Sequence, residues 1–173
     1  MKHITFYLDF VSPYAWLAYE RLPDALEGLS YSVSYKPVLL GALLQQHANP
    51  GPAGIAPKRD WTYRQVAWLA HMNRIDLQLP ASHPFNPLGL LRLAVACDAG
   101  GEPNRYVCET IFRHVWRGGE EAADPARLEA LTRHLAPERP PQDAAVKAQL
   151  QAHGEQALAA GDTVEVVTFV GGG

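Results

Sequence analysis

The sequence predicts an α/β protein in which a strand–helix–strand unit is followed by a long run of helices and a late strand. Two observations support this prediction. Strand-like patterns occupy residues 2–10 and 30–38 and return only at residues 163–170. The chain between them has helical patterns separated by Pro and Gly, whereas an ordinary doubly wound sheet would alternate strands with helices throughout.

The N-terminal unit begins with KHITFYLDF, residues 2–10, whose β-branched and aromatic residues predict a strand. Ser12 and Pro13 follow at once and predict a helix start, because Ser is a good N-cap and Pro is favoured at the first helical position. We expect this helix to end at Gly28. Residues 30–38 alternate apolar with polar side chains, which predicts a half-buried second strand parallel to the first.

From Leu39 onward the pattern becomes helical. LLGALLQQ predicts a short helix, and ANPGPAGIAP after it predicts a loop. Further helices are expected at residues 58–74, 86–99, 104–117, 125–135 and 141–160. TVEVVTFV, residues 163–170, has strand character, and we expect it to pair beside the first strand.

Composition and charge exclude several classes of function. A chain of 173 residues with 47 % apolar and 19 % charged residues suits one globular domain. Its formal charge of −3 gives no reason to expect nucleic acid or an anionic membrane as partner. No apolar run reaches the roughly 20 residues of a membrane span, and no signal-peptide pattern is present, so a cytoplasmic location is expected.

Cysteine and histidine usage predicts no metal site. Cys97 and Cys108 match neither a zinc spacing nor a CxxC redox pair, and both fall in helical patterns as small core residues would. The seven histidines are dispersed and never adopt a ligand spacing.

Ser12 is the first candidate for chemistry. Its hydroxyl and the N–H groups after it lie at the positive end of a helix dipole, which stabilises a nearby anion such as a thiolate. The alternative is that Ser12 only caps its helix. No Gly-x-Ser-x-Gly motif frames Ser12 and no His lies near it in sequence, so we expect a hydrogen-bond donor rather than a nucleophile.

Two further groups of residues suggest ligand contacts. Lys36 ends a strand, and Asn49 and Lys58 flank the Gly/Pro loop, so these side chains suit the binding of carboxylates, or else are ordinary exposed polar groups. In HPFNPLGLLRLA, Asn86 is expected to cap a helix, and Phe85 suits either a hydrophobic staple or a pocket wall.

The segments FYLDFVSPYAWLA, YKPVLLGAL, N…PKRDW and HPFNPLGLLRLA together resemble the 2-hydroxychromene-2-carboxylate isomerase family. That family is related to kappa-class glutathione transferases and to DsbA-like thiol oxidoreductases. The resemblance implies a thioredoxin-like fold with a large all-helical insertion: residues 1–38 and 141–173 would form the thioredoxin-like domain and 39–140 the inserted domain. SPYA stands where the oxidoreductases carry Cys-Pro-x-Cys, so dithiol–disulfide exchange is excluded at this site.

The resemblance also implies a function: glutathione-dependent interconversion of 2-hydroxychromene-2-carboxylate and trans-o-hydroxybenzylidenepyruvate in aromatic catabolism of the naphthalene type. Ser12 would donate a hydrogen bond to the glutathione sulfur. The implied glutathione contacts are Ser12, Lys36, Asn49, Lys58 and Val166, and the implied substrate contacts are Leu44, Gly54, Ile55, Phe85 and Asn86. The alternatives are a kappa-class-like glutathione transferase acting on small electrophiles and a non-catalytic ligand-binding protein.

The C-terminal segment departs from the family pattern. Val167 stands where the family has the Pro of Gly-Val-Pro-Thr, so we expect a trans peptide at Val166–Val167, and the family's Trp-Gly-x-Asp-Arg segment is lacking. The C-terminal part of the thioredoxin fold is therefore expected to be incomplete. Expected partners are glutathione and a small aromatic carboxylate, with no nucleic acid and no membrane, and a homodimer would cover the exposed sheet edge.

Overall fold

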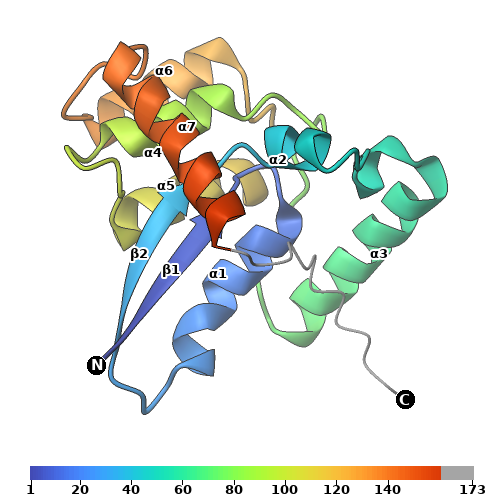
Figure 1. The fold of residues 1–173 in the computed structure, drawn as a ribbon. Helices are drawn as coiled ribbons and strands as arrows, with labels where there is room; N and C mark the ends of the chain where they lie inside the picture. The colour runs from blue at the N-terminus through green and yellow to red at the C-terminus, as the bar shows by residue number, and fades with distance from the viewer. Residues whose placement is uncertain (161–173) are drawn as a thin grey trace.

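The computed structural model describes residues 1–160, which form two strands and seven α-helices around one core (Figure 1). The helical insertion predicted after the second strand is present. In chain order the elements are β1 (Lys2–Leu8), α1 (Pro13–Ala25), β2 (Tyr31–Pro37), α2 (Leu40–Gln46), the 3₁₀ turn η1 (Pro52–Gly54), α3 (Ala56–Met72), α4 (Leu88–Ala96), α5 (Arg105–Trp116), α6 (Pro125–Leu135) and α7 (Ala144–Ala159).

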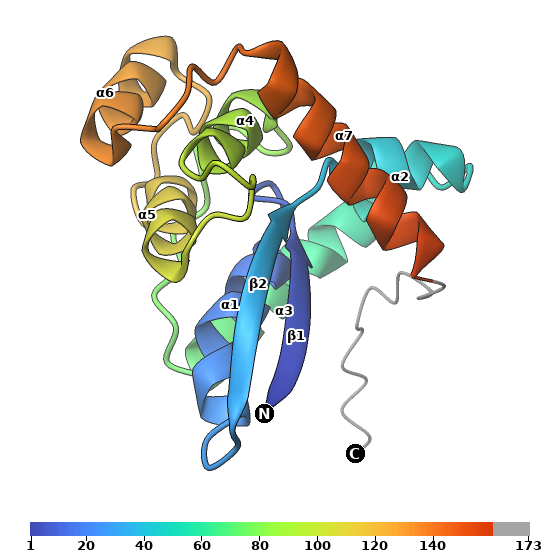
Figure 2. The same ribbon diagram turned by 60° about the vertical axis from the view of Figure 1, so that its left-hand side comes forward.

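The sheet positions the rest of the fold. β1 and β2 pair in parallel, with Lys2 opposite Tyr31 and Leu8 opposite Pro37, as the helix-length connection between them predicted. Neighbouring residues of a strand point to opposite faces, and Tyr35 lies against Tyr19 of α1 whereas Lys36 reaches Gln156 of α7. The sheet therefore has α1 on one face and α7 on the other, near the end of β2 (Figure 2).

The helix boundaries follow from local sequence signals. Ser12, Asn104, Asp124 and Asp143 cap α1, α5, α6 and α7, each accepting a hydrogen bond from a backbone N–H of the first turn. The expected start of α4 at Asn86 was wrong, because Pro87 holds the cap position and the helix begins at Leu88. The Asn86 side chain still satisfies that helix start, since its Oδ1 accepts from the Leu88 N–H at 3.0 Å.

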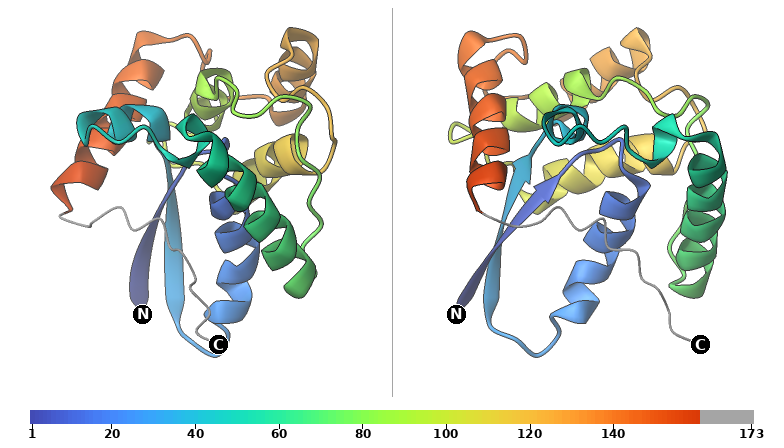
Figure 3. Two further views of the ribbon diagram at one scale, coloured as in Figure 1. Left: turned by 90° about the vertical axis from the view of Figure 1, so that its right-hand side faces the viewer. Right: turned by 45° about the vertical axis from the view of Figure 1, so that its right-hand side comes forward.

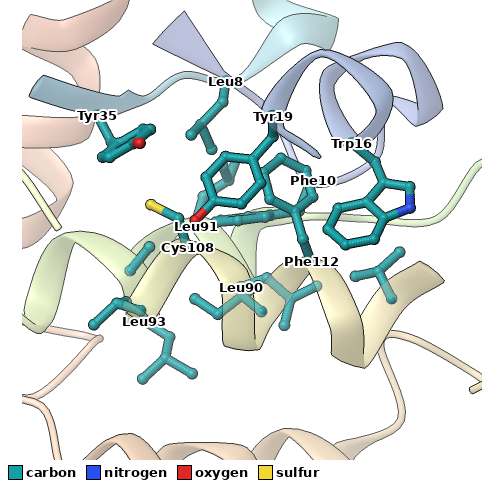
Figure 4. Close-up of a cluster of buried hydrophobic side chains, with 14 of the residues drawn as sticks. Leu8, Phe10, Trp16, Tyr19, Tyr35, Leu90, Leu91, Leu93, Cys108 and Phe112 are labelled. Carbon is teal, nitrogen blue, oxygen red and sulfur yellow. The ribbon is translucent and has the colours of Figure 1, made fainter. Parts of the chain in front are cut away.

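One hydrophobic core joins the strand–helix–strand unit to the inserted helices (Figure 4). Trp16 and Tyr19 project from α1 onto Phe112 of α5, with ring centroids 5.7 and 5.1 Å from that ring. Phe10 meets the same ring edge-on at 4.9 Å. Aromatic pairs of this kind add about 0.5–1.5 kcal/mol each beyond their buried area, so the turn between β1 and α1 is held firmly against α5.

Helix α3 lies beside α1 at the edge of the molecule (Figure 3). Val66 and Ala70 face the core, whereas Trp61, Trp68 and Met72 are 53, 59 and 60 % exposed. Trp68 follows Trp61 after two helical turns and Met72 follows one turn later, so these three side chains form a single row, here called the α3 stripe. A row of three large apolar side chains is more than the scattered exposure usual on a protein surface.

The predicted strand at 163–170, together with Val166, Val167 and the expected incomplete end of the fold, lies outside the described residues. Within residues 1–160, no helix is both long and apolar enough to cross a lipid bilayer.

Candidate functional site

Ser12 lies at the N-terminus of α1, directly after the end of β1. Its backbone is extended, its Oγ accepts from the Ala15 N–H at 3.2 Å, and its own N–H donates to the Asp9 carbonyl at 3.1 Å. Pro13 occupies the first helical position, and the first turn contains no acidic residue. The predicted cap geometry is confirmed, and the helix end is suited to an anion.

Two hydrogen-bond donors at this helix end have no acceptor among residues 1–160. The Ser12 Oγ receives a hydrogen bond from Ala15, but its own hydroxyl hydrogen has no recorded acceptor there. The Tyr14 N–H is likewise unpaired within the described chain, because it belongs to the first turn of α1 and has no helix carbonyl before it to bond. Among residues 1–160, one O–H and one N–H at this helix end therefore remain available to a ligand.

Asp9 shapes the turn that presents Ser12. Its carboxylate is 3 % exposed and accepts from the Val11 N–H at 3.1 Å and from the Leu40 N–H at 2.8 Å. Burial raises the pKa of Asp9 from 3.8 to about 6, against the opposing effect of these two hydrogen bonds. Asp9 therefore ties the Ser12 turn to the first residue of α2, and sequence reasoning did not single it out.

His83 also reaches this turn, although it is 72 residues from Val11 in the chain. Its Nε2 lies 2.7 Å from the Val11 carbonyl oxygen, and its Nδ1 lies 2.7 Å from the Tyr63 hydroxyl. Burial lowers the pKa of His83, which favours the neutral ring. The sequence offered only the HPFNP motif as a signal, and nothing local connected that motif to Ser12.

Phe85 and Asn86 follow His83 in the same segment. Phe85 is half-buried against the core, and its ring centroid lies 6.1 Å from that of His83. The structure therefore brings Phe85 to the neighbourhood of the Ser12 turn through His83. Asn86 is exposed, its Oδ1 accepts from the Leu88 N–H just after the cap residue Pro87, and its amide nitrogen has no partner within residues 1–160.

Leu44 and Asn49 lie together at the end of α2. The Asn49 N–H donates to the Leu44 carbonyl at 2.9 Å, and the Asn49 Oδ1 accepts from the Gly51 N–H at 2.8 Å. Both line a shallow hollow whose other walls are Gly41, Gln45, Ala48 and Pro50. Gly51 has φ +69°, and a Cβ there would come within 3.0 Å of the Leu44 side chain, so this turn requires glycine.

Gly54, Ile55 and Lys58 connect this loop to α3. Gly54 is exposed at the end of η1, and half-buried Ile55 occupies the cap position of α3. Lys58 is exposed in the first turn of α3 and has no carboxylate within ion-pair distance in the described chain. Its charge is therefore available to an anionic ligand.

Lys36 has partners within the chain. Its Nζ lies 3.2 Å from a Glu102 carboxylate oxygen and donates to Gln156 Oε1 at 2.8 Å. These contacts place the Lys36 ammonium on the α7 face of the sheet, whereas α1 covers the other face. A role for Lys36 in glutathione binding remains a prediction. The Lys36 ammonium would have to leave Glu102, or contact both Glu102 and the ligand.

The thiols suit packing rather than chemistry. Cys108 is fully buried and burial raises its pKa, and burial also raises the pKa of Cys97 to about 11. Among residues 1–160, no group of three or more His, Cys, Asp or Glu side chains could hold a metal ion.

Two curated relatives are similar to this chain. A 2-hydroxychromene-2-carboxylate isomerase of Sphingobium xenophagum is 30 % identical over 130 residues, and one of Pseudomonas sp. (strain C18) is 27 % identical over 132 residues. The matched regions cover 73 and 74 % of this chain, but only 65 and 59 % of the relatives. The chain thus matches less than two thirds of the length of each relative.

The fold has a solved counterpart. The structure of a 2-hydroxychromene-2-carboxylate isomerase superposes with a TM-score of 0.71, covering 92 % of this chain and 81 % of the other at 19 % identity. At that identity the likeness shows a shared fold. The model of the family described as the DSBA-like thioredoxin domain matches residues 3–155, which is most of the chain. The chain therefore belongs to the family of DSBA-like thioredoxin domains, with Ser12 at the start of its first helix.

Proposed function

We propose that this protein is a glutathione-dependent isomerase that interconverts 2-hydroxychromene-2-carboxylate and trans-o-hydroxybenzylidenepyruvate. The single observation that supports it most is that two donors at the start of α1, the Ser12 hydroxyl and the Tyr14 N–H, have no acceptor within residues 1–160. They suit an anionic sulfur supplied by a ligand. The similarity to two proteins named 2-hydroxychromene-2-carboxylate isomerase supports the reaction class.

Ser12 and Tyr14, together with two polar residues that flank the α2–α3 loop, would bind glutathione. Ser12 and Tyr14 would hold the sulfur, and the dipole of α1 would favour its ionised form. The exposed Lys58 ammonium and the Asn49 amide, on either side of the α2–α3 loop, would hold carboxylates of the tripeptide. When bound, glutathione supplies a thiolate able to add to a conjugated carbon and leave again, which removes the double-bond character that prevents rotation.

The remaining residues would form the substrate side of the site. Phe85 offers a half-buried aromatic edge for the ring of a small aromatic carboxylate. Leu44 of α2, Gly54 of η1 and Ile55 at the start of α3 would supply apolar or open surface, and the exposed Asn86 amide would supply a donor. This composition, mostly apolar with a few polar groups, is typical of sites for small organic ligands.

A thermal-shift titration with glutathione, followed by an isomerase assay, tests the proposal. Glutathione at 100 times its Kd should stabilise the protein by about 2.7 kcal/mol. Stabilisation together with interconversion of the two compounds is the expected result. Stabilisation with conjugation of electrophiles but without interconversion would identify a glutathione transferase. The absence of any shift at millimolar glutathione would favour a non-catalytic protein and contradict the proposal.

We also propose that the protein forms a homodimer through the α3 stripe. Trp61 and Trp68 lie symmetrically about the middle of α3, so two antiparallel copies would place each Trp61 beside the other copy's Trp68. Such a contact is isologous and closes on itself as a two-fold dimer. Tryptophan side chains buried in this way are frequent anchors of protein–protein interfaces.

A further inference from the structure

His83 connects two parts of the molecule that are far apart in sequence. It lies in the extended segment between α3 and α4, and its ring stands between the Tyr63 hydroxyl of α3 and the Val11 carbonyl of the Ser12 turn. Both ring nitrogens are engaged at 2.7 Å. Because a carbonyl can only accept, Nε2 carries the proton and donates to Val11. In the neutral ring Nδ1 then accepts, so Tyr63 donates to it.

The side chains around His83 favour the neutral form of its ring. The ring packs against Trp116 of α5 at 5.5 Å and against Phe85 of its own segment at 6.1 Å, and this burial lowers its pKa. Tyr63 is the titratable group that faces the ring from α3. Desolvation raises the pKa of Tyr63, and Asp60 acts in the same direction whereas Arg59 opposes it, so the phenol keeps its proton at neutral pH.

The hydrogen bond to Val11 acts on the peptide group that leads into Ser12. That peptide carries the Val11 carbonyl, which accepts from His83, and the Ser12 N–H, which donates to the Asp9 carbonyl at 3.1 Å. A planar peptide held at both of its polar ends has a fixed orientation. The orientation of that plane sets the direction of the Ser12 N–Cα bond, on which the hydroxyl and the first turn of α1 are built.

We propose that His83 is a positioning residue for the Ser12 site, which holds the Val11–Ser12 peptide so that both free donors converge on one ligand atom. This inference rests on the proposed function, because the ligand atom is the glutathione sulfur. His83 does not touch that atom, since both of its nitrogens are occupied. Its contribution is to hold the donors of α1 in place through the Val11 carbonyl, while the Tyr63 hydroxyl holds the other side of the ring from α3.

Loss of His83 should affect the site more than the fold. The Ser12–Ala15 cap and the aromatic contacts of Phe10 and Trp16 do not involve His83, so α1 should remain in place. The peptide plane before Ser12 would be released, and small misplacements at a reacting centre can reduce rates by as much as about 100-fold.

The test compares three variants. His83→Leu removes the ring nitrogens, His83→Gln keeps an N–H donor the same number of bonds from the backbone, and His71→Leu removes an exposed histidine of α3 as a control. We expect His83→Leu to raise the apparent thiol pKa of bound glutathione and to lower kcat about 10- to 100-fold with a small change in KM. His83→Gln should recover most of the loss, and His71→Leu should behave as the wild type. Equal losses in His83→Leu and His83→Gln would overturn the proposal.

A second measurement separates this inference from the proposed function. Hydrogen exchange of the backbone amides from Val11 to Trp16 needs no ligand. Faster exchange there in His83→Leu, with normal exchange in His83→Gln, is expected even if the wild type fails to bind glutathione, and that failure would count against the proposed function alone. Unchanged exchange in His83→Leu would overturn the positioning role.

Discussion

The Asp9 carboxylate and the Leu40 N–H are joined by a hydrogen bond of 2.8 Å, which links the turn before α1 to the first residue of α2. The second oxygen of the same carboxylate accepts from Val11 in that turn. One buried charge thus aligns two segments of the candidate site, the Ser12 turn and the helix that leads to Leu44 and Asn49. Its burial also makes the stability of the protein depend on pH.

We expect Asp9→Asn to change the pH dependence of stability. The pKa of Asp9 is raised from 3.8 to about 6, so protonation favours the folded state. This contribution is fully present below pH 4 and is lost as pH rises through 6. The free energy of unfolding of the wild type, relative to Asp9→Asn, should therefore fall by about 2 kcal/mol between pH 4 and 7.

Urea denaturation at several pH values measures this difference. Asp24→Asn, which removes an exposed carboxylate from α1, is the matched control and should run parallel to the wild type. A constant difference between wild type and Asp9→Asn across the range would show that Asp9 is not desolvated in solution.

Removal of the Lys58 charge should weaken glutathione binding in a salt-dependent way. Lys58 is exposed, so its attraction for a carboxylate is screened over about 10 Å at 0.1 M salt but over about 30 Å at 0.01 M. Calorimetry of Lys58→Gln should show a larger loss of affinity at low salt than at high salt. Lys147→Gln, an exposed cation of α7, is the control and should bind as the wild type does. Equal losses for Lys58→Gln at both salt concentrations would point to packing instead of charge.

A charge within the α3 stripe should prevent dimerisation. Trp68 is 59 % exposed and central to the proposed contact, so Trp68→Glu would bury a carboxylate without a partner. Light scattering over a concentration series should give a dimer for the wild type and a monomer for Trp68→Glu. Leu29→Glu, which alters an exposed apolar residue between α1 and β2, should remain dimeric. A wild type that stays monomeric at every concentration would rule out the stripe as a dimer surface.

The parts of this structure that could be predicted from sequence are those specified by neighbours in the chain. Ser12 and Pro13 predicted the start of α1 because capping depends on residues within one turn, and the alternation of residues 30–38 predicted β2 because strand burial has a period of two. Asn86 was placed one residue too early as the cap, since the cap position belongs to Pro87, whose backbone is helical without joining α4.

The contacts that organise the site were not predictable in this way. His83 and Val11 are 72 residues apart, and only the packing of α3 and α5 against α1 brings them together. The ion pair of Lys36 with Glu102 likewise depends on the loop before α5 meeting β2. A local sequence pattern carries no information about such pairs. The ligand-binding residues were suggested by the resemblance to a family, whereas the residues that hold the Ser12 turn in place, Asp9 and His83, were found only in the structure.

Ser12 is the residue on which the proposed chemistry depends, and its substitution requires a control for stability. Ser12→Ala removes the cap of α1 together with the hydroxyl, at an expected cost of about 1 kcal/mol. Asn104→Ala removes a comparable cap from α5, where Asn104 Oδ1 accepts from Val107 at 3.0 Å. A loss of function shared by both variants would reflect stability, whereas a loss confined to Ser12→Ala would reflect the site.

The most direct measurement is the pH titration of the ultraviolet thiolate absorbance of glutathione bound to the wild type, Ser12→Ala and Asn104→Ala. Hydrogen bonding to the ionised sulfur and the dipole of α1 should keep bound glutathione largely ionised at pH 7 in the wild type and in Asn104→Ala. Ser12→Ala should raise the apparent thiol pKa by about one unit, which corresponds to about 1.4 kcal/mol of lost stabilisation. Bound glutathione that is equally ionised in Ser12→Ala and in the wild type would contradict the role of the Ser12 hydroxyl.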